Sequence, residues 1–462
     1  MKTTLNETDL APVMSALSEA NGIFSRRFPG VSMSRQPVHT VYGGAHLYKP
    51  GAAARLTQLA QQSLSTYASD YADFAGALGI QGYETAQSPV SDAEAHIARL
   101  MFERVSTKLA SEAVEDHRVD FEDGYGSRPD AEEDQHAFAA ATAMAEGLAA
   151  GTLPSQVGLR IKALTEEARV RALQTLDIFI TTLAASGHGL PLRFVVTLPK
   201  VTSEAQVAAL ADCLDLLEQR CGLETGGIHI ELMIETVQSM LTPAGEIRIP
   251  ALVGAGRGRV SCAILGTFDY TASCNIASNY QDHRHPAADF ARNLMQVCLT
   301  GTPVTLCDGI TNIMPIGPHR PDRDGSLSAT QLEENRQVVR GAWQVHFNNV
   351  MHSLKRGYYQ GWDLNPAQIP ARFAAVYYFF LTGLDDATAR LKTFVDRAAQ
   401  ASLVGNTFDD AATGQGLVNF FVSGLNCGAL SEEDVVRTGI TLEELKGRSF
   451  LRIVENRTQV TE

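Results

Sequence analysis

Short apolar runs alternate with longer segments of helical periodicity along most of the chain. Apolar runs of about four to eight residues between turn signals are typical of buried strands, whereas apolar positions three or four apart indicate amphipathic helices. The pattern predicts eight strands, which begin near His39, His117, Val157, Leu192, His229, Arg259, Pro303 and Gly357. Strands that alternate with helices form parallel sheets, and eight such units favour closure as a (β/α)8 barrel, the TIM-barrel fold.

Segments at both ends of the chain fall outside this alternation. Residues 1–36 predict an N-terminal helical arm, and residues 371–462 predict a C-terminal helical extension. The barrel domain is expected over residues 37–370. It contains an insertion at about residues 65–104, which is longer than an ordinary connection between a strand and a helix.

An acid lies at the end of each of two apolar runs. The run His229–Thr236 contains Glu235 near its end, and the run Arg259–Tyr270 contains Asp269 near its end. In a barrel of parallel strands both acids would lie at the C-terminal face, where barrel enzymes hold their active sites. Two carboxylates suit Mg²⁺, which commonly takes one or two of them together with water and substrate. Acids are also favoured at helix starts, so a purely structural role stays open.

Charged residues of two other predicted strands add to this end of the barrel. Glu122 and Asp123 follow the second strand, so two more acids are expected at the rim. Arg160 and Lys162 share one face of the third strand, because side chains alternate along a strand. A basic side chain inside an apolar strand has to pair with an acid or bind an anion. These residues therefore predict a charged site around the two acids.

The composition restricts the classes of function. The chain has 462 residues and a net charge of −14, which argues against a nucleic-acid partner because such partners favour basic surfaces. No apolar run reaches the roughly 18 residues of a membrane-spanning helix. No phosphate-binding P-loop and no glycine fingerprint for dinucleotides follows a strand. The N-terminus lacks the apolar core of a signal peptide, and the seven cysteines form no CxxC pair, so a cytoplasmic, reduced protein is expected.

Six ordered motifs resemble the HpcH/HpaI aldolase and citrate lyase β-subunit superfamily. They are Asp120-Phe-Glu-Asp-Gly, Leu159-Arg-Ile-Lys-Ala-Leu, Leu198-Pro-Lys-Val, Ile234-Glu-Thr, Leu265-Gly-Thr-Phe-Asp-Tyr and Gly361-Trp-Asp-Leu-Asn-Pro-Ala-Gln-Ile. The resemblance covers about residues 38–370. Lys162 stands where the usual motif has Asn, and Asn365 stands where it has His. With the insertion and the C-terminal extension, these departures indicate a divergent branch of the superfamily.

The resemblance implies roles for the charged residues. Glu235 and Asp269 occupy the positions of the ligands of Mg²⁺ (or Mn²⁺). Arg160 matches the arginine that holds the substrate carboxylate or enolate oxygen, and Glu122 and Asp123 match acids near the metal and its waters. The implied activity is that of a metal-dependent carbon–carbon lyase or aldolase, which acts through the enolate of a 2-keto acid such as pyruvate.

Further substrate contacts and a base complete the expected site. We expect Lys162, Gly266 and Thr267 to bind substrate together with Arg160. Glu122 and Asp123 are expected to be catalytic, because the expected base is a metal-bound water relayed by one of them. His46 and His283 are alternatives, because histidine titrates near neutral pH.

Two other functions stay open at this point. One is a lyase or malate-synthase-like condensing enzyme that acts on a CoA thioester by the same enolate chemistry. The other is a non-catalytic barrel kept as a binding or regulatory subunit. The resemblance also implies a homo-oligomer, with the C-terminal helices as the expected contact.

Overall fold

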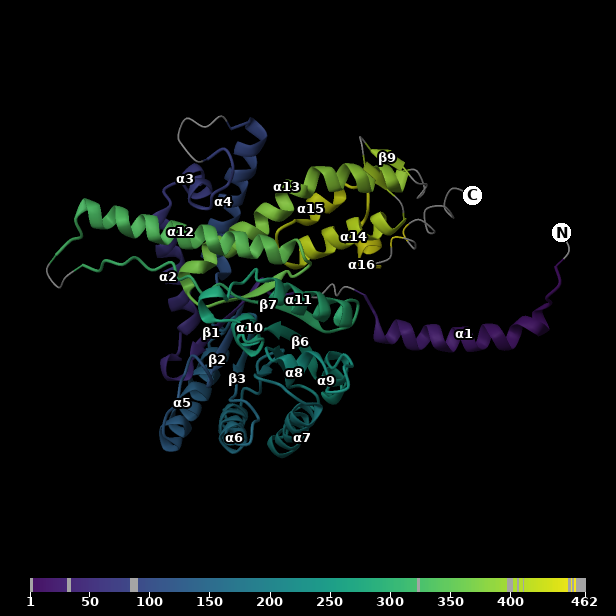
Figure 1. Cartoon of the computed structure of the whole chain (residues 1–462), viewed down its shortest axis with the longest axis horizontal. Coiled ribbons are helices and arrows are strands. Elements are labelled where there is room, and N and C mark those ends of the chain that lie inside the picture. The colour runs from purple at the N-terminus through teal and green to yellow at the C-terminus, as the bar shows by residue number, and fades with distance from the viewer. Residues whose placement is uncertain are drawn as a thin grey trace.

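Eight parallel strands close into a barrel in the computed structural model of the chain (Figure 1). They are β1 (His39–Gly44), β2 (Asp116–Asp120), β3 (Gln156–Arg160), β4 (Val195–Leu198), β5 (His229–Ile234), β6 (Val260–Leu265), β7 (Thr305–Ile310) and β8 (Gln360–Asp363). Each strand pairs with its neighbour in chain order, and β8 pairs with β1 to close the ring. The predicted (β/α)8 TIM barrel is confirmed. The structure describes residues 3–30, 35–83, 90–321, 325–396, 402–404, 407–409, 411–447, 450 and 453.

Helices surround the barrel and continue beyond it. Those between the strands are α2 (Ala52–Tyr67), α3 (Tyr71–Ala77), α4 (Asp92–Glu112), α5 (Asp130–Ala149), α6 (Arg169–Ala185), α7 (Glu204–Cys221), α8 (Val237–Met240), α9 (Ile249–Ala255), α10 (Thr267–Ser273), α11 (Pro286–Leu299) and α12 (Ala329–Leu354). After β8 come α13 (Ile369–Asp396), the antiparallel strands β9 (Ser402–Val404) and β10 (Thr407–Asp409), α14 (Ala411–Asn426), α15 (Glu432–Val436) and α16 (Leu442–Lys446). Within the described ranges, no helix is both long and apolar enough to cross a bilayer.

The sixth strand is shorter than the sequence predicts. β6 ends at Leu265, and Thr267 begins α10, so Asp269 lies in the first turn of a helix instead of at a strand end. The apolar run continues through Phe268 and Tyr270, and a short apolar run does not separate strand from helix by its period. Glu235 does follow a strand directly, because β5 ends at Ile234. The two acids therefore reach the rim in different ways.

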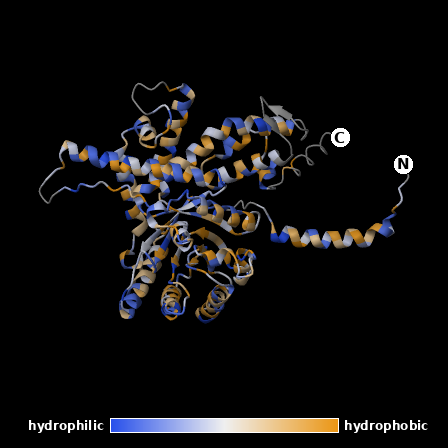
Figure 2. Cartoon of the chain, viewed as in Figure 1, coloured by the Kyte–Doolittle hydropathy of each residue, from blue (hydrophilic) through white to orange (hydrophobic). Residues whose placement is uncertain are grey.

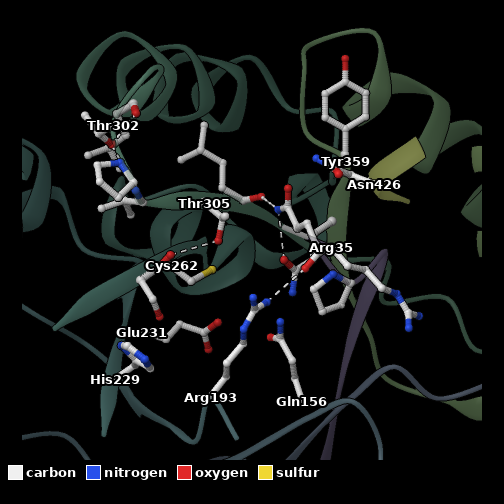
Figure 3. A pocket seen from close by; sticks show the side chains of 18 of the residues that line it. Arg35, Gln156, Arg193, His229, Glu231, Cys262, Thr302, Thr305, Tyr359 and Asn426 are labelled. Atoms are coloured by element: carbon white, nitrogen blue, oxygen red, sulfur yellow. Dashed lines mark hydrogen bonds between the residues drawn. The ribbon is translucent and has the colours of Figure 1, made fainter. Parts of the chain in front are cut away.

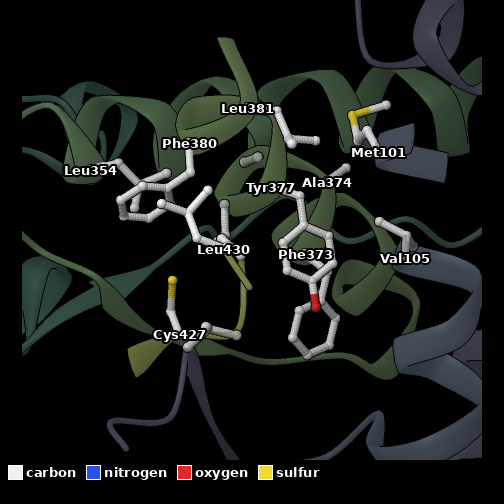
Figure 4. Packing of buried hydrophobic residues seen from close by; sticks show 14 of the residues in the cluster. Met101, Val105, Leu354, Phe373, Ala374, Tyr377, Phe380, Leu381, Cys427 and Leu430 are labelled. Atoms are coloured by element: carbon white, nitrogen blue, oxygen red, sulfur yellow. The ribbon is translucent and has the colours of Figure 1, made fainter. Parts of the chain in front are cut away.

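Most of the inserted segment is helical and belongs to a large outer core. Residues 65–104 contribute α3 and part of α4, and residues 84–89 lie outside the described residues. Met101 and Val105 of α4 pack in one cluster with Tyr377 and Phe380 of α13 (Figure 4). The aromatic run of α13 thus serves as core. The division of the chain into arm, barrel and extension stays a prediction.

The first helix extends away from the rest of the molecule. α1 (Glu7–Arg27) begins with a capping box at Asn6, and none of its residues is buried. Apolar and polar residues alternate along it in Figure 2, and Val13, Leu17 and Phe24 are among its exposed apolar side chains. The helical nature of the predicted N-terminal arm is confirmed, while its bounds at residues 1–36 stay a prediction. The expected homo-oligomer stays a prediction.

The interior of the barrel is polar as well as apolar. Arg118 Nη1 lies 2.8 Å from Asp116 Oδ1, and Arg118 Nη2 lies 3.8 Å from Glu231 Oε2. The Tyr42 hydroxyl donates to Glu231 Oε1 at 2.7 Å. Trp362 packs with Tyr42 inside the barrel, with ring centroids 4.5 Å apart. Ionised groups thus run through the middle of the molecule, where burial makes each pairing costly to break.

Acid is expected to destabilise the fold through His117 of β2. Burial, with the charges of Arg118 and His39, lowers the pKa of His117 to about 4. In the unfolded chain the pKa of His117 is about 6.5. Between pH 6.5 and pH 4, the imidazole is therefore protonated in the unfolded chain and neutral in the folded protein. The free energy of unfolding is therefore expected to fall by about 3 kcal/mol over this range because of His117. Urea unfolding at a series of pH values measures this slope.

The control for this prediction is a His117→Gln variant. Burial raises the pKa of Asp116 to about 6, which contributes a slope of opposite sign as the pH falls. The difference between parent and variant removes that contribution and leaves the effect of His117. Equal slopes in parent and variant would contradict the prediction.

Candidate functional site

Charged side chains from neighbouring strands meet at the C-terminal end of the barrel. They are Glu122 and Asp123 after β2, Arg160 at the end of β3, Lys200 after β4, Glu235 after β5 and Asp269 in the first turn of α10. Parallel strands bring the ends of β2 to β6 to one rim, which is why residues far apart in the chain come together.

Arg160 is held rigidly by acids and aromatic rings. Its Nε and Nη2 donate to the two carboxylate oxygens of Asp120 at 2.7 and 2.6 Å, and its Nη1 lies 3.0 Å from Glu122 Oε2. Its guanidinium carbon lies 5.0 Å from the ring centre of Tyr42 and 5.2 Å from that of Trp362. Burial lowers the pKa of Arg160, but the charges of Asp120 and Glu122 outweigh burial and raise it. A guanidinium fixed in this way is a permanent positive charge.

Lys200 lies among the acids and contacts four of them. Its backbone N–H donates to Glu235 Oε1 at 2.6 Å. Its ammonium nitrogen is hydrogen-bonded to Glu122, lies 3.2 Å from Asp123 Oδ2 and lies 3.7 Å from Asp269 Oδ1. The backbone of Lys200 is left-handed, with φ of 51°. This conformation directs both the N–H and the side chain toward the site.

Glu235 is a buried acid that lacks enough positive charge around it. Burial, together with the nearby negative charges of Asp269 and Glu122, raises its pKa to about 8, although Lys200 opposes the shift. Burial also raises the pKa of Glu122, although Arg160 and Lys200 oppose the shift. The site therefore contains more carboxylates than cations, and added positive charge would stabilise their ionised forms.

These residues fit a divalent cation. A Cβ on Gly266 would lie 2.3 Å from Glu235 Oε2, so the absence of a side chain there leaves room for the carboxylate. The buried Thr267 Oγ1 has no hydrogen-bond partner among the described residues. No group of three or more metal-ligating side chains occurs in the described part of the chain. A pair of carboxylates is a common Mg²⁺ donor set.

Lys162 is engaged away from this group of charges. Its ammonium nitrogen donates to Glu133 Oε2 of α5 and to the carbonyl oxygen of Phe121, both at 2.7 Å. It also lies 5.1 Å from the ring centre of Tyr125. The strand ends at Arg160, so the alternation that would have kept Lys162 on the same face as Arg160 no longer applies.

The two predicted histidines have other contacts. The ring of His46 lies 5.7 Å from Tyr125 and 6.3 Å from His136, and burial with the charge of Arg128 lowers its pKa. His283 is buried and lies within hydrogen-bond distance of the Ile310 carbonyl oxygen and the Ser353 hydroxyl. Neither set of contacts includes the acids of the rim. Their roles as a base stay predictions with less support than that of Glu122.

Asn365 caps the short helical turn Pro366–Gln368 that follows β8. Its side-chain oxygen accepts from the backbone N–H of Ala367, and Gln368 Oε1 accepts from the backbone N–H of Asn365, which together form a capping box. This turn leads β8 into α13. An amide at this position is therefore accounted for by local structure.

Sequence reasoning gave no site role to three residues that shape the site. Asp120 holds Arg160 on two hydrogen bonds, Lys200 joins the acids, and Trp362 lies under the guanidinium. The signal for Asp120 was available, because an acid in a buried strand needs a polar or charged partner. The left-handed backbone of Lys200 has no comparable signal in the sequence.

The comparisons with known proteins agree with this fold. The sequence model of a family described as a domain of unknown function (DUF6986) matches residues 17–453. No curated protein matches the chain.

Three solved structures illustrate the similarity. A citrate lyase from Burkholderia xenovorans LB400 is 17% identical, with a TM-score of 0.51, over 74% of this chain and 93% of its own. CitE from Mycobacterium tuberculosis, in complex with magnesium, acetoacetate and coenzyme A, is 16% identical with a TM-score of 0.45, over 71% of this chain and 95% of its own. Malate synthase from Haloferax volcanii, as a lead(II) complex, is 14% identical with a TM-score of 0.43, over 93% of this chain and 99% of its own. The Burkholderia structure confirms the fold that the resemblance implies.

Proposed function

The chain belongs to the DUF6986 family, and we propose that it is a magnesium-dependent enzyme that makes or breaks a carbon–carbon bond next to a carbonyl group. The proposed substrate is a 2-keto acid such as pyruvate or a 4-hydroxy-2-keto acid. The observation that carries the proposal is the buried surplus of carboxylates at the barrel rim beside a fixed guanidinium. This combination supports a metal and an anionic substrate in the same place.

Glu235 and Asp269 are the proposed metal ligands. A divalent cation, when bound, supplies Lewis-acid stabilisation of charge on a substrate oxygen. The two carboxylates would no longer repel each other in its presence, which offsets the unfavourable burial of Glu235. Lys200 keeps the Glu235 carboxylate in place through its backbone N–H. Gly266 leaves the space that this carboxylate needs.

Arg160 is proposed to bind the substrate carboxylate or the developing oxyanion. It needs no reorganisation during the reaction, because Asp120 and two aromatic rings already fix its direction. A preorganised donor of this kind stabilises the transition state more than the ground state. Thr267, whose buried hydroxyl lacks a partner among the described residues, is the proposed second polar contact.

Glu122 is the proposed base. Its pKa is raised by burial, which brings it closer to neutral pH, and it contacts both Arg160 and Lys200. A base works best when its pKa lies near the working pH. Asp123 is more exposed and would assist by holding Lys200. In this arrangement Lys200 moves no proton but keeps the base and the metal ligands together.

The test is the exchange of pyruvate methyl protons for deuterium, followed by proton NMR. With Mg²⁺ the protein is expected to catalyse exchange about a thousandfold faster than the same protein treated with a chelator, because metal stabilisation is worth several kcal/mol. Restoring Mg²⁺ is expected to restore the rate. Exchange that persists with chelator would contradict the metal role.

Two further arms separate this proposal from the alternatives. If the protein exchanges acetyl-CoA protons and is retained on immobilised CoA, the substrate is a CoA thioester instead of a keto acid. The enolate chemistry is the same in both cases. If the protein binds keto acids tightly but shows no turnover and holds no metal, it is a non-catalytic binding protein. In the enzyme reading, cleavage of a 4-hydroxy-2-keto acid is the expected companion result.

A further inference from the structure

A cavity of about 380 Å³ opens at the end of the barrel opposite to the acids (Figure 3). It is lined by residues that begin strands: Gln156 of β3, Val195 of β4, His229 of β5, Thr305 of β7 and Gln360 of β8. Its size lies within the range of about 300–1,000 Å³ that is typical of small-molecule sites. Nothing in the proposed reaction uses this end of the barrel.

Three arginines line the cavity, and two of them have ionic partners among the residues that the structure describes. Arg35 pairs with Glu112 and Glu115 at 2.5 and 2.6 Å. Arg118 is buried and pairs with an acid inside the barrel. Arg193 forms no ion pair in the ranges that the structure describes, and it donates only to the carbonyl oxygen of Arg35 at 3.5 Å. Figure 3 shows its side chain among those that line the pocket.

Buried polar atoms at the inner end of the cavity also lack partners. Arg118 is 1% exposed, and its Nε has no hydrogen-bond partner among the described residues. Glu231 Oε2 is likewise buried and without a hydrogen bond there. A buried polar group without a partner is unfavourable, so a ligand or water that bonds to it removes that cost. The cavity thus offers a donor at its mouth, and a donor and an acceptor at its inner end.

The remaining wall of the cavity is largely apolar. Val195, Leu299, Val304 and Leu306 all contribute to it. Burial lowers the pKa of His229, so this ring is neutral at pH 7 and adds no charge. One unpaired guanidinium beside an apolar wall matches a monoanion with an apolar body better than it matches a compact polyanion, which needs several cations.

We propose that this cavity is a second binding site, which takes a small organic carboxylic acid with an apolar body. The carboxylate binds the guanidinium of Arg193 at the mouth, and the body lies along Val195 and Val304 toward Arg118. The site is separate from the metal pair, so its existence does not depend on the proposed reaction.

The test uses benzoate as the probe, with isothermal titration calorimetry on the full chain. Benzoate is expected to bind saturably in the millimolar range or tighter, and neutral benzamide is expected to bind about tenfold more weakly or worse. Arg193→Gln is expected to weaken benzoate binding by about tenfold or more, because a hydrogen-bonded charge is lost. The matched control is Arg220→Gln, which removes an exposed charge from α7, and it is expected to leave the affinity unchanged.

A second variant separates binding from folding. Arg193 has a left-handed backbone with φ of 59°, a conformation that glycine adopts without strain. Arg193→Gly is therefore expected to retain or raise the melting temperature and still lose benzoate binding. A crystal soaked with 4-bromobenzoate is expected to show anomalous bromine signal in the cavity.

Three results would overturn the proposal. The first is an absence of saturable benzoate binding. The second is equal affinity in the parent and the Arg193 variants, or bromine located elsewhere. The third is inorganic phosphate that binds tighter than benzoate, which would assign the cavity to a simple inorganic anion.

Discussion

Replacement of Glu235 by glutamine is expected to lower the rate of pyruvate proton exchange by about a thousandfold or more, because loss of metal stabilisation costs several kcal/mol. Glutamine keeps the shape of the side chain but removes its negative charge. The backbone N–H of Lys200 still finds an oxygen acceptor on the amide. The variant therefore isolates the charge that the cation needs. Exchange followed by proton NMR at saturating Mg²⁺ measures the effect.

The folding of this variant is expected to be intact. The raised pKa of Glu235, about 8, means that the folded protein disfavours its charge between the ordinary carboxyl value and pH 8. Stability from this group is therefore lost as pH rises through that range, and removal of the charge relieves the loss. The melting temperature of the variant at pH 8 is expected to equal or exceed that of the parent.

Two variants frame this result. Asp269→Asn is expected to give the same loss, and the double variant no further loss, because residues that act as a unit are not additive. Glu224→Gln, which removes an exposed carboxylate from the loop after α7, is the matched control and is expected to leave activity unchanged. Full activity of Glu235→Gln, or a tenfold loss in the Glu224 variant as well, would contradict the proposed metal ligand.

Replacement of Arg160 by glutamine is expected to reduce both activity and stability. The rate of exchange is expected to fall by about a hundredfold to a thousandfold, the usual effect of removing one preorganised oxyanion donor. The free energy of unfolding is expected to fall by about 3–5 kcal/mol, because Asp120 is left buried without its guanidinium. Proton exchange and urea unfolding measure the two effects separately.

A double variant distinguishes the two roles of Arg160. In Arg160→Met with Asp120→Leu, both buried charges are gone, so most of the lost stability is expected to return. Activity is not expected to return, because no positive charge faces the substrate. The Arg160→Lys variant is also expected to be poorly active, because an ammonium group cannot make the bidentate hydrogen bonds that the guanidinium makes to Asp120. Activity recovered in the double variant would show that Arg160 acts only on folding.

The barrel was predictable because its signal repeats. Each of the eight predicted strands overlaps an observed strand, and β2 and β3 begin one residue before the predicted starts at His117 and Val157. Turn-forming residues such as glycine and proline separate the strands from the helices. Glu122, Asp123 and Arg160 were identified by the same logic, as charges that follow or interrupt apolar runs. Parallel pairing then brings them to one rim, which is a property of the fold alone.

The parts that escaped prediction depend on geometry beyond the strand period. Asp269 reaches the rim from a helix, because the run after Gly266 turns helical, and its apolar residues did not reveal this. Lys162 turns toward Glu133 once β3 has ended. The position of Lys200 among the acids depends on its left-handed backbone, with φ of 51°. No residue pattern in the sequence specifies a left-handed φ at a lysine.

Lys200 links the site to the heat tolerance of the whole molecule. A side chain in the left-handed region costs about 1 kcal/mol or more, and glycine would avoid this cost. Glycine would also remove the ammonium group that lies among Glu122, Asp123 and Asp269. The strain that glycine would relieve is therefore offset by the ion pairs that it would lose, because Glu122 is nearly buried and would be left without its ammonium partner. The lysine thus exchanges backbone strain for charge compensation at the site.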